Sequence, residues 1–484
     1  MNFKLNRTTA LADFAIPSHS AAWRCPAFEQ LPNTFDNLQD VPGSSPNTSM
    51  RFTFLGLFSL VSTAILDRIT SHKENLMITY NSLLLASIAS LGLATAALAE
   101  GSQMQSAGAL AFDNGNVLFV GDGKDGVVHA FDFGKSGFED QTGYELGRAQ
   151  TFEGRTIFNG LDKEIAALLG VAAEDIIIND MVVHKPSKQI ILSVHRGLGP
   201  EAEPVLIKIN NGAVELLNFD KAAHTSMSVG PVLAEATLEF GQPLNSLAIT
   251  DIDYYNGEIF VAGISNEEFS SKLRRMAYPF DNTISTSSIE IWHAVHAQYE
   301  TRAPIISQTI TELNGEPTLV AVYACTPIVR IPLADLQDGA EVRGTMIGEM
   351  GFGNTPIDIV PYVNGWDQTS NFIVTNTNRS AVTLPADAVA KAKPMPHGEG
   401  AQPFFAVGGV TQYTMPLSGT LHLDTIDETW AVVVRRSPED PRNIQLHTLP
   451  MPFFFDRADH VVEMNWEDGP DPFGYKAAPP VSFN

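Results

Sequence analysis

The chain has 484 residues and a formal net charge of −25 at pH 7, from 55 acidic and 30 basic side chains. Such a polyanion repels nucleic acid and anionic lipid, which excludes both as main binding partners. The acidity either attracts metal cations or a basic partner protein, or serves solubility in a salty medium.

The N-terminal part of the chain does not resemble the rest. Residues 1–76 combine a polar stretch rich in Pro, Asn and Ser with an apolar run that is too short to span a bilayer comfortably. Residues 77–99 are an apolar run that ends in Ala97-Leu98-Ala99 before Glu100. An apolar segment followed by an A-x-A site is the form of a secretory signal peptide, so we expect cleavage after Ala99. An uncleaved membrane anchor is the alternative.

Cleavage at this site would make the mature protein periplasmic or secreted, with no membrane span. Residues 1–76 are then a leader that we do not expect in the mature protein, and the start codon stays open between Met1, Met50 and Met77. The first 99 residues hold six basic and six acidic side chains, so residues 100–484 carry the whole net charge of −25. We expect residues 100–484 to form a single domain.

From about residue 105 onward, short apolar runs alternate with turns. Asn-Gly pairs recur between these runs and predict β-hairpins, because both central residues of a type I′ turn need positive φ. The pairs are Asn114-Gly115, Asn211-Gly212, Asn256-Gly257, Asn314-Gly315 and Asn364-Gly365. Only residues 162–169 predict a clear helix, since acidic residues at their start suit a helix N-terminus.

The runs group into a loose repeat. Units of roughly 50–70 residues begin near residues 108, 179, 250, 303, 357 and 420, and several of them show a strand, a small turn, a strand and a polar exit. Repeated four-stranded units of this size are typical of a radial arrangement. We therefore predict an all-β fold, a β-propeller of six or seven four-stranded blades. An array of β-sandwiches explains this period less well.

Two segments carry a resemblance to known proteins. Residues 109–122 (ALAFDNGNVLFVGD) and 252–263 (IDYYNGEIFVAG) resemble repeats of seven-bladed propellers of the NHL, lactonase and surface-layer-repeat kind. The resemblance covers most of residues 105–450 and implies a closed ring of blades. Its motifs are common to propellers in general, so they indicate a fold and no activity.

An acidic residue recurs near the first strand of three units, as Asp180, Asp251 and Asp358. In a propeller the first strand of each blade lines the central channel, so these carboxylates would converge near one channel mouth. Convergent oxygens suit Ca²⁺ or another divalent metal such as Mg²⁺, with Asn179 and Asn245 as neutral oxygen donors. The alternative is that each Asp caps its own loop by accepting backbone N–H groups.

Cysteine and histidine give weaker signals. Cys325 is the only cysteine after the leader, which contains Cys25, so the mature chain has no intramolecular disulfide. We interpret Cys325 as a buried small hydrophobic residue. His293 and His296 form an H-x-x-H pair, but positions i and i+3 of a strand face opposite ways. The pattern therefore argues against a shared metal unless the segment is helical.

Motifs of high catalytic specificity are missing from the sequence. It contains no G-x-S-x-G, H-E-x-x-H, C-x-x-C-H or P-loop pattern. We therefore expect a binding module for a protein or a small-molecule ligand. The alternative is a metal-dependent, lactonase-like hydrolase with a carboxylate-lined site at the channel mouth, so whether the protein is an enzyme stays open.

Overall fold

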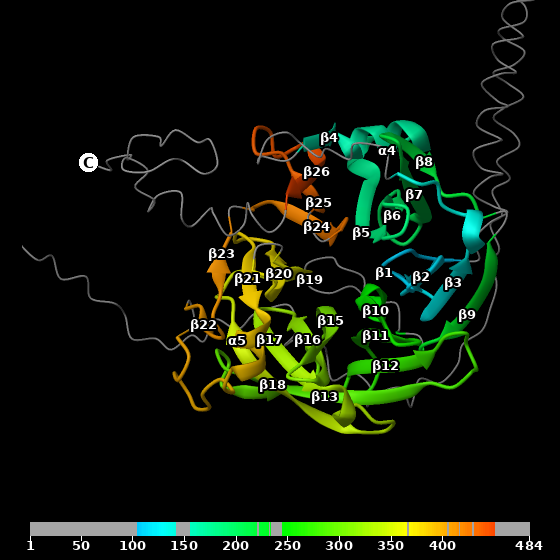
Figure 1. The fold of residues 1–484 in the computed structure, drawn as a ribbon. Helices are drawn as coiled ribbons and strands as arrows, with labels where there is room; N and C mark the ends of the chain where they lie inside the picture. Colours follow the sequence, from blue (N-terminus) through cyan, green and yellow to red (C-terminus); the bar gives the residue numbers. More distant parts are fainter. Residues whose placement is uncertain are drawn as a thin grey trace, which may run out of the picture.

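The computed structural model describes residues 104–450, apart from 142–154, 220–221, 232, 234–243, 365–366, 404–405, 416 and 428–429. The expected leader (1–76) and signal peptide (77–99) lie outside the described residues. Within them the fold is all-β, and every strand pair but one is antiparallel. The predicted fold class is confirmed, because the sheets stand side by side in a ring (Figure 1).

The described strands form six groups of four. The first is β1 (Leu110–Phe112), β2 (Val117–Asp122), β3 (Val127–Asp132) and β9 (Ala223–Ser228); the second is β5 (Ile176–His184), β6 (Gln189–Arg196), β7 (Glu203–Asn210) and β8 (Ala213–Leu216). The third is β10 (Asp251–Tyr255), β11 (Glu258–Ile264), β12 (Ser271–Ala277) and β13 (Ser285–His293); the fourth is β15 (Ile305–Leu313), β16 (Glu316–Tyr323), β17 (Pro327–Pro332) and β18 (Glu341–Glu349). The fifth is β19 (Pro356–Val363), β20 (Ser370–Asn376), β21 (Val382–Pro385) and β23 (Tyr413–Thr414); the sixth is β24 (Thr420–Thr425), β25 (Trp430–Arg436), β26 (Ile444–Pro450) and β4 (Arg155–Asn159).

The ring closes through its inner strands. These strands contact one another in the order β1, β10, β15, β19, β24, β5 and back to β1. They lie around the centre of the ring in Figure 1, so side chains from different groups can meet there.

Two groups contain strands from distant parts of the chain. Strand β4 pairs with β26, so a segment before the second group completes the sixth. Strand β9 pairs with β3 and completes the first group only after the second has been built. The groups therefore do not follow one another around the ring in sequence order. The first group lies between the second and the third.

The third and fourth groups are joined into one sheet. Their outer strands β13 and β18 pair in parallel, from Ser288 opposite Glu341 to Ile291 opposite Gly344. Short strands β14 (Gln298–Glu300) and β22 (Gly408–Gly409) extend this sheet to ten strands. We call the junction of β13 and β18 the seam.

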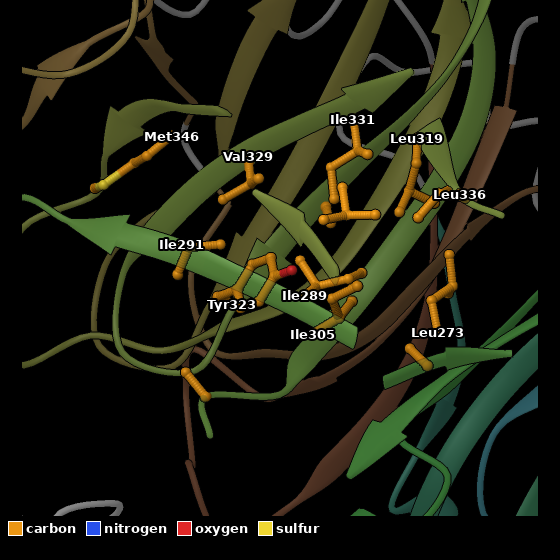
Figure 2. Close-up of a cluster of buried hydrophobic side chains, with 14 of the residues drawn as sticks. Leu273, Ile289, Ile291, Ile305, Leu319, Tyr323, Val329, Ile331, Leu336 and Met346 are labelled. Atoms are coloured by element: carbon orange, nitrogen blue, oxygen red, sulfur yellow. The ribbon is translucent and has the colours of Figure 1, made fainter. Parts of the chain in front are cut away.

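A large buried cluster lies between these two groups. Ile289, Leu319, Tyr323 and Val329 are at most 1% exposed and pack together from the three strands β13, β16 and β17 (Figure 2). Strands whose alternate residues are apolar place those residues on the face toward the neighbouring sheet. The core of the ring is therefore located between its sheets.

Most of the predicted hairpin turns are present. Asn211, Asn256 and Asn314 and the glycine after each have positive φ, as a type I′ turn requires. Asn114-Gly115 differs, because neither residue has positive φ and the Asp113 carboxylate accepts the N–H of Gly115 instead. Gly365, the second residue of the fifth pair, lies outside the described residues.

Helix is scarce among the described residues. The expected helix is α4 (Leu161–Leu169), with Asp162 and Glu164 in its first turn. A second short helix, α5 (Ala386–Lys391), was not predicted. The four 3₁₀ turns are η1 (Gly134–Ser136), η2 (Ala173–Asp175), η3 (Leu244–Leu247) and η4 (Leu333–Asp335).

Candidate metal centre in the central channel

The three predicted aspartates all lie on inner strands. Asp180 is on β5, Asp251 begins β10 and Asp358 is near the start of β19. Since these strands contact one another around the centre of the ring, the three aspartates lie around the channel.

Each of these carboxylates binds the backbone of the next inner strand around the ring. Asp180 Oδ2 accepts the N–H of Leu110 on β1 at 2.7 Å, and Asp251 Oδ2 accepts the N–H of Gln308 on β15 at 2.6 Å. Asp358 Oδ2 accepts the N–H of Leu423 on β24 at 2.7 Å. Local capping, the alternative from the sequence, is also present at two of them, because Asp180 and Asp251 each accept the N–H of the residue that follows.

Two further aspartates repeat this contact. Asp253 Oδ2 accepts the N–H of Ile310 at 2.8 Å, and Asp424 Oδ2 accepts the N–H of Val183 at 2.7 Å. An inner strand is a sheet edge with unsatisfied backbone donors, and a carboxylate on the neighbouring strand satisfies one of them. These aspartates thus connect neighbouring sheets at the channel wall.

The carboxyl groups also affect one another's protonation. Burial, assisted by the charge of Asp424, raises the pKa of Asp180 to about 7. Burial and the charge of Asp180 raise the pKa values of Asp251 and Asp358 well above the usual range of an aspartate. Since these charges act across the channel, a cation there would relieve both the burial cost and the repulsion.

His422, on β24, completes a compact group that the sequence did not reveal. One carboxylate oxygen each from Asp180 and Asp358 and one ring nitrogen of His422 all lie within 4.8 Å of one another. We call these three residues the channel cluster. Asp251 is not a member, although its charge acts on Asp180 and Asp358. His422 and Asp424 are two residues apart on β24 and therefore lie on the same face of the strand. This spacing is the sequence feature that could have identified His422 as a channel residue.

The imidazole of His422 is oriented for a ligand. Its Nε2 lies 3.3 Å from the carbonyl oxygen of Ile178, to which it donates, and its Nδ1 lies 3.7 Å from Asp180 Oδ1. Nδ1 is buried and has no hydrogen-bond partner among the described residues. Burial lowers the pKa of His422 to about 4, so the ring is neutral at physiological pH and Nδ1 keeps its lone pair.

The two predicted amide donors have other contacts. Asn179 donates from its side-chain nitrogen to the carbonyl oxygen of Ala107 at 2.8 Å. Asn245 lies in η3, where its backbone oxygen accepts the N–H of Ala248. The structure thus gives Asn179 a role in holding the N-terminal segment and Asn245 a role in a tight turn.

Two grooves lie where inner strands end. The larger, of about 990 Å³, includes Glu312, Asp367 and Asp387. The other, of about 720 Å³, includes Lys185, Val363 and Thr425, at or next to the ends of β5, β19 and β24. The channel cluster lies nearer the starts of β19 and β24, which places the second groove toward the other mouth.

Comparison with known proteins adds little to this geometry. No protein-family model matches the chain, and no curated protein is detectably similar to it. The NHL, lactonase and surface-layer-repeat resemblance therefore has no support from a family match. Among the described residues, no helix is long and apolar enough to cross a membrane.

Similar solved structures are distant. A chain of the mitotic checkpoint complex has 6% identity and a TM-score of 0.27, over 72% of this chain and 89% of that one. A protein of unknown function from Dyadobacter fermentans DSM 18053 has 12% identity and a TM-score of 0.31, over 57% and 100%. Raptor from Chaetomium thermophilum has 12% identity and a TM-score of 0.29, over 73% and 29%. These identities and TM-scores are too low to support an argument. The propeller assignment therefore rests on the strand pairing and on the ring of contacts between inner strands.

Proposed function

We propose that this protein is an exported binding module that holds a divalent cation at the channel cluster and presents it to a ligand. The observation that carries the proposal is the convergence of two carboxylates and a neutral imidazole within 4.8 Å. The buried Nδ1 of His422 supports it, because such an atom needs a partner and a metal ion would supply one. Ligand binding and export are parts of the same proposal.

The donor set indicates the class of cation. Ca²⁺ and Mg²⁺ prefer oxygen ligands alone, whereas an imidazole nitrogen beside two carboxylates suits Zn²⁺ or Mn²⁺. We therefore place a transition ion ahead of the Ca²⁺ or Mg²⁺ expected from the aspartates alone. The hydrogen bonds from Leu110 and Leu423 to Asp180 and Asp358 would hold both carboxylates in position for it.

A metal-dependent hydrolase remains the second candidate. The pKa of about 7 at Asp180 favours it, since such a carboxyl group exchanges a proton near neutral pH. Both oxygens of Asp180 already accept backbone N–H groups, from Leu110 and Met181, which suits a fixed ligand better than a base that must turn toward substrate. Binding is therefore the function that the geometry supports best.

Metal titration of the mature chain, residues 100–484, tests the proposal. Zn²⁺ or Mn²⁺ should raise the melting temperature of metal-free protein by binding only its folded form. His422→Gln should remove the part of the shift that comes from the channel. Asp253→Asn is the matched control, because Asp253 bridges inner strands in the same way but stands outside the channel cluster. An equal loss in both variants, or no loss in His422→Gln, contradicts the channel site.

The same preparation separates binding from hydrolysis. Metal-loaded protein should leave simple lactones and esters intact. Turnover that is lost on metal removal and in Asp180→Asn would instead establish the hydrolase.

A further inference from the structure

The end of the seam brings together three segments that are distant in the sequence. His293 is the last residue of β13, and Glu349 is the last residue of β18. Cys325 lies in the turn between β16 and β17. These positions are outside the channel and its cluster, since β13 and β18 are the outer strands of their groups.

His293 and His296 lie together, contrary to the expectation from the sequence. That expectation assumed a continuous strand, but β13 ends at His293 and the chain turns back into β14. The backbone N–H of His296 donates to the carbonyl oxygen of His293, and Ala297 has a φ of 52°. The turn brings the two ring centroids to 4.0 Å from each other.

One carboxylate orients both imidazole rings. Glu300 Oε2 lies 3.0 Å from Nδ1 of His293, and Glu300 Oε1 lies 2.6 Å from Nδ1 of His296. A carboxylate accepts, so each Nδ1 is assigned the hydrogen and each Nε2 keeps the lone pair. Metal-binding histidines commonly have such a carboxylate on their second nitrogen.

The metal-facing side of His293 is buried and lacks a donor. Its side chain is 0% exposed, and its Nε2 has no hydrogen-bond partner among the described residues. Glu349 Oε2 lies 3.8 Å from this Nε2, is equally buried and likewise has no hydrogen-bond partner there. Two buried acceptors that face each other are unfavourable unless something positive stands between them.

Cys325 adds a sulfur to this group. Its Sγ and one ring nitrogen from each histidine lie within 4.8 Å of one another. Its φ is 73°, in the left-handed region that a residue with a side chain rarely adopts. Such strain persists where the surroundings impose it, and functional sites are common places for it. The interpretation of Cys325 as a buried small hydrophobic residue did not reveal that it lies in this strained turn.

We infer that His293, His296, Cys325 and Glu349, the seam cluster, bind a single transition-metal ion, with Zn²⁺ as the best fit. Two imidazole nitrogens, a thiolate and a carboxylate form a four-ligand set that Zn²⁺ accepts at tetrahedral geometry. Hard cations such as Ca²⁺ and Mg²⁺ have little affinity for sulfur and nitrogen. The sulfur makes a copper ion the main competitor for the site.

The ion would be a structural clamp between two sheets. Four protein ligands fill a tetrahedral coordination sphere and leave no position for a substrate. The ligands come from β13 and its turn on one side and from the β16–β17 turn and β18 on the other. Binding would therefore fasten the third group to the fourth beyond their last paired residues, Ile291 and Gly344.

Protection of Cys325 in the unaltered mature chain is the first test, and it needs no variant. Cys325 is the only cysteine after residue 99, so alkylation reports on it alone. One equivalent of Zn²⁺ should slow alkylation of metal-free protein at least tenfold, whereas Mg²⁺ should not. If neither Zn²⁺ nor copper changes the rate of Cys325 alkylation, the inference is overturned. If only copper slows alkylation, the bound ion is copper and the choice of Zn²⁺ is overturned.

Variants then separate the seam cluster from the channel cluster. Glu300→Gln keeps all four ligands and should weaken Zn²⁺ protection by about 10–100-fold, the usual effect of losing an orienting carboxylate. His422→Gln should leave protection unchanged. Loss of protection in His422→Gln but not in Glu300→Gln would contradict the seam site. Since His422→Gln tests the channel cluster and Glu300→Gln tests the seam cluster, either idea can fail without the other.

Discussion

Asp253 allows the effect of a half-buried channel carboxyl on stability to be measured apart from the channel cluster. Burial raises its pKa from 3.8 to about 6, against the hydrogen bonds that it accepts from Ile310 and Tyr254. A carboxyl group whose pKa is raised on folding favours the folded state while protonated. Its contribution is present below the unfolded pKa of about 4 and is lost as the pH rises through about 6.

The pKa values set the size of the expected effect. A shift from 3.8 to about 6 corresponds to up to about 3 kcal/mol of unfolding free energy, lost mostly between pH 4 and pH 6. In the Asp253→Asn variant the asparagine side chain does not ionise, so this loss of unfolding free energy with rising pH is removed. It also lowers the repulsion on Asp251, whose pKa the charge of Asp253 helps to raise. The wild type should therefore be less stable at pH 7 than at pH 4.5, and the variant should show a smaller decrease.

Urea unfolding of metal-free protein, followed by tryptophan fluorescence at pH 4.5 and pH 7 and at constant ionic strength, measures the effect. Asp281→Asn is the control, because Asp281 is exposed and its pKa is lowered by hydrogen bonds from Thr283. An equal pH dependence of the urea midpoint in wild type and Asp253→Asn would refute the reasoning, whatever the absolute stability of the variant.

Three other predictions concern processing, core and turns. Intact-mass measurement of protein exported by a bacterial host should give an N-terminus at Glu100, and retention of residues 50–99 would contradict the signal peptide. Leu319→Ala, at a position with 0% exposure in the cluster of Figure 2, should cost about 2–5 kcal/mol in chemical unfolding. Asn256→Ala should lower the melting temperature while Asn256→Gly should not, because the φ of 51° at this turn suits Asn and Gly but not Ala. Equal effects of the two turn variants would show that the backbone conformation is not the cause.

The fold was predictable because its signals are local. Asn-Gly turns between apolar runs indicate hairpins, and their recurrence indicates repeated sheets. The completion of the first and sixth groups by β9 and β4 was not predictable in this way. Two strands that pair over a long separation carry no sequence pattern that identifies each other as partners. The sequence therefore did not show that the first group lies between the second and the third.

The candidate sites likewise contain some residues that a local pattern predicts and some contacts that only the folded chain shows. Equivalent positions in the repeat identified Asp180, Asp251 and Asp358, since a ring places equivalent residues around one axis. The backbone groups that they bind on neighbouring strands could not be predicted from their own segments. His293 and His296 were misjudged because the end of β13 falls between them, and strand ends are the least certain part of a sequence-based prediction.

The pairing of β4 with β26 has a consequence for the order of folding. Asn159 and its partner Gln445 are 286 residues apart, so β4 is synthesised long before the strand that it joins. Until β26 emerges, β4 has no partner strand and its edge stays open, and contacts over so long a separation form late and slowly. A nascent or truncated chain would thus expose edges prone to aggregation. A chaperone that shields β4 during synthesis should improve yield more than one that acts on the finished ring.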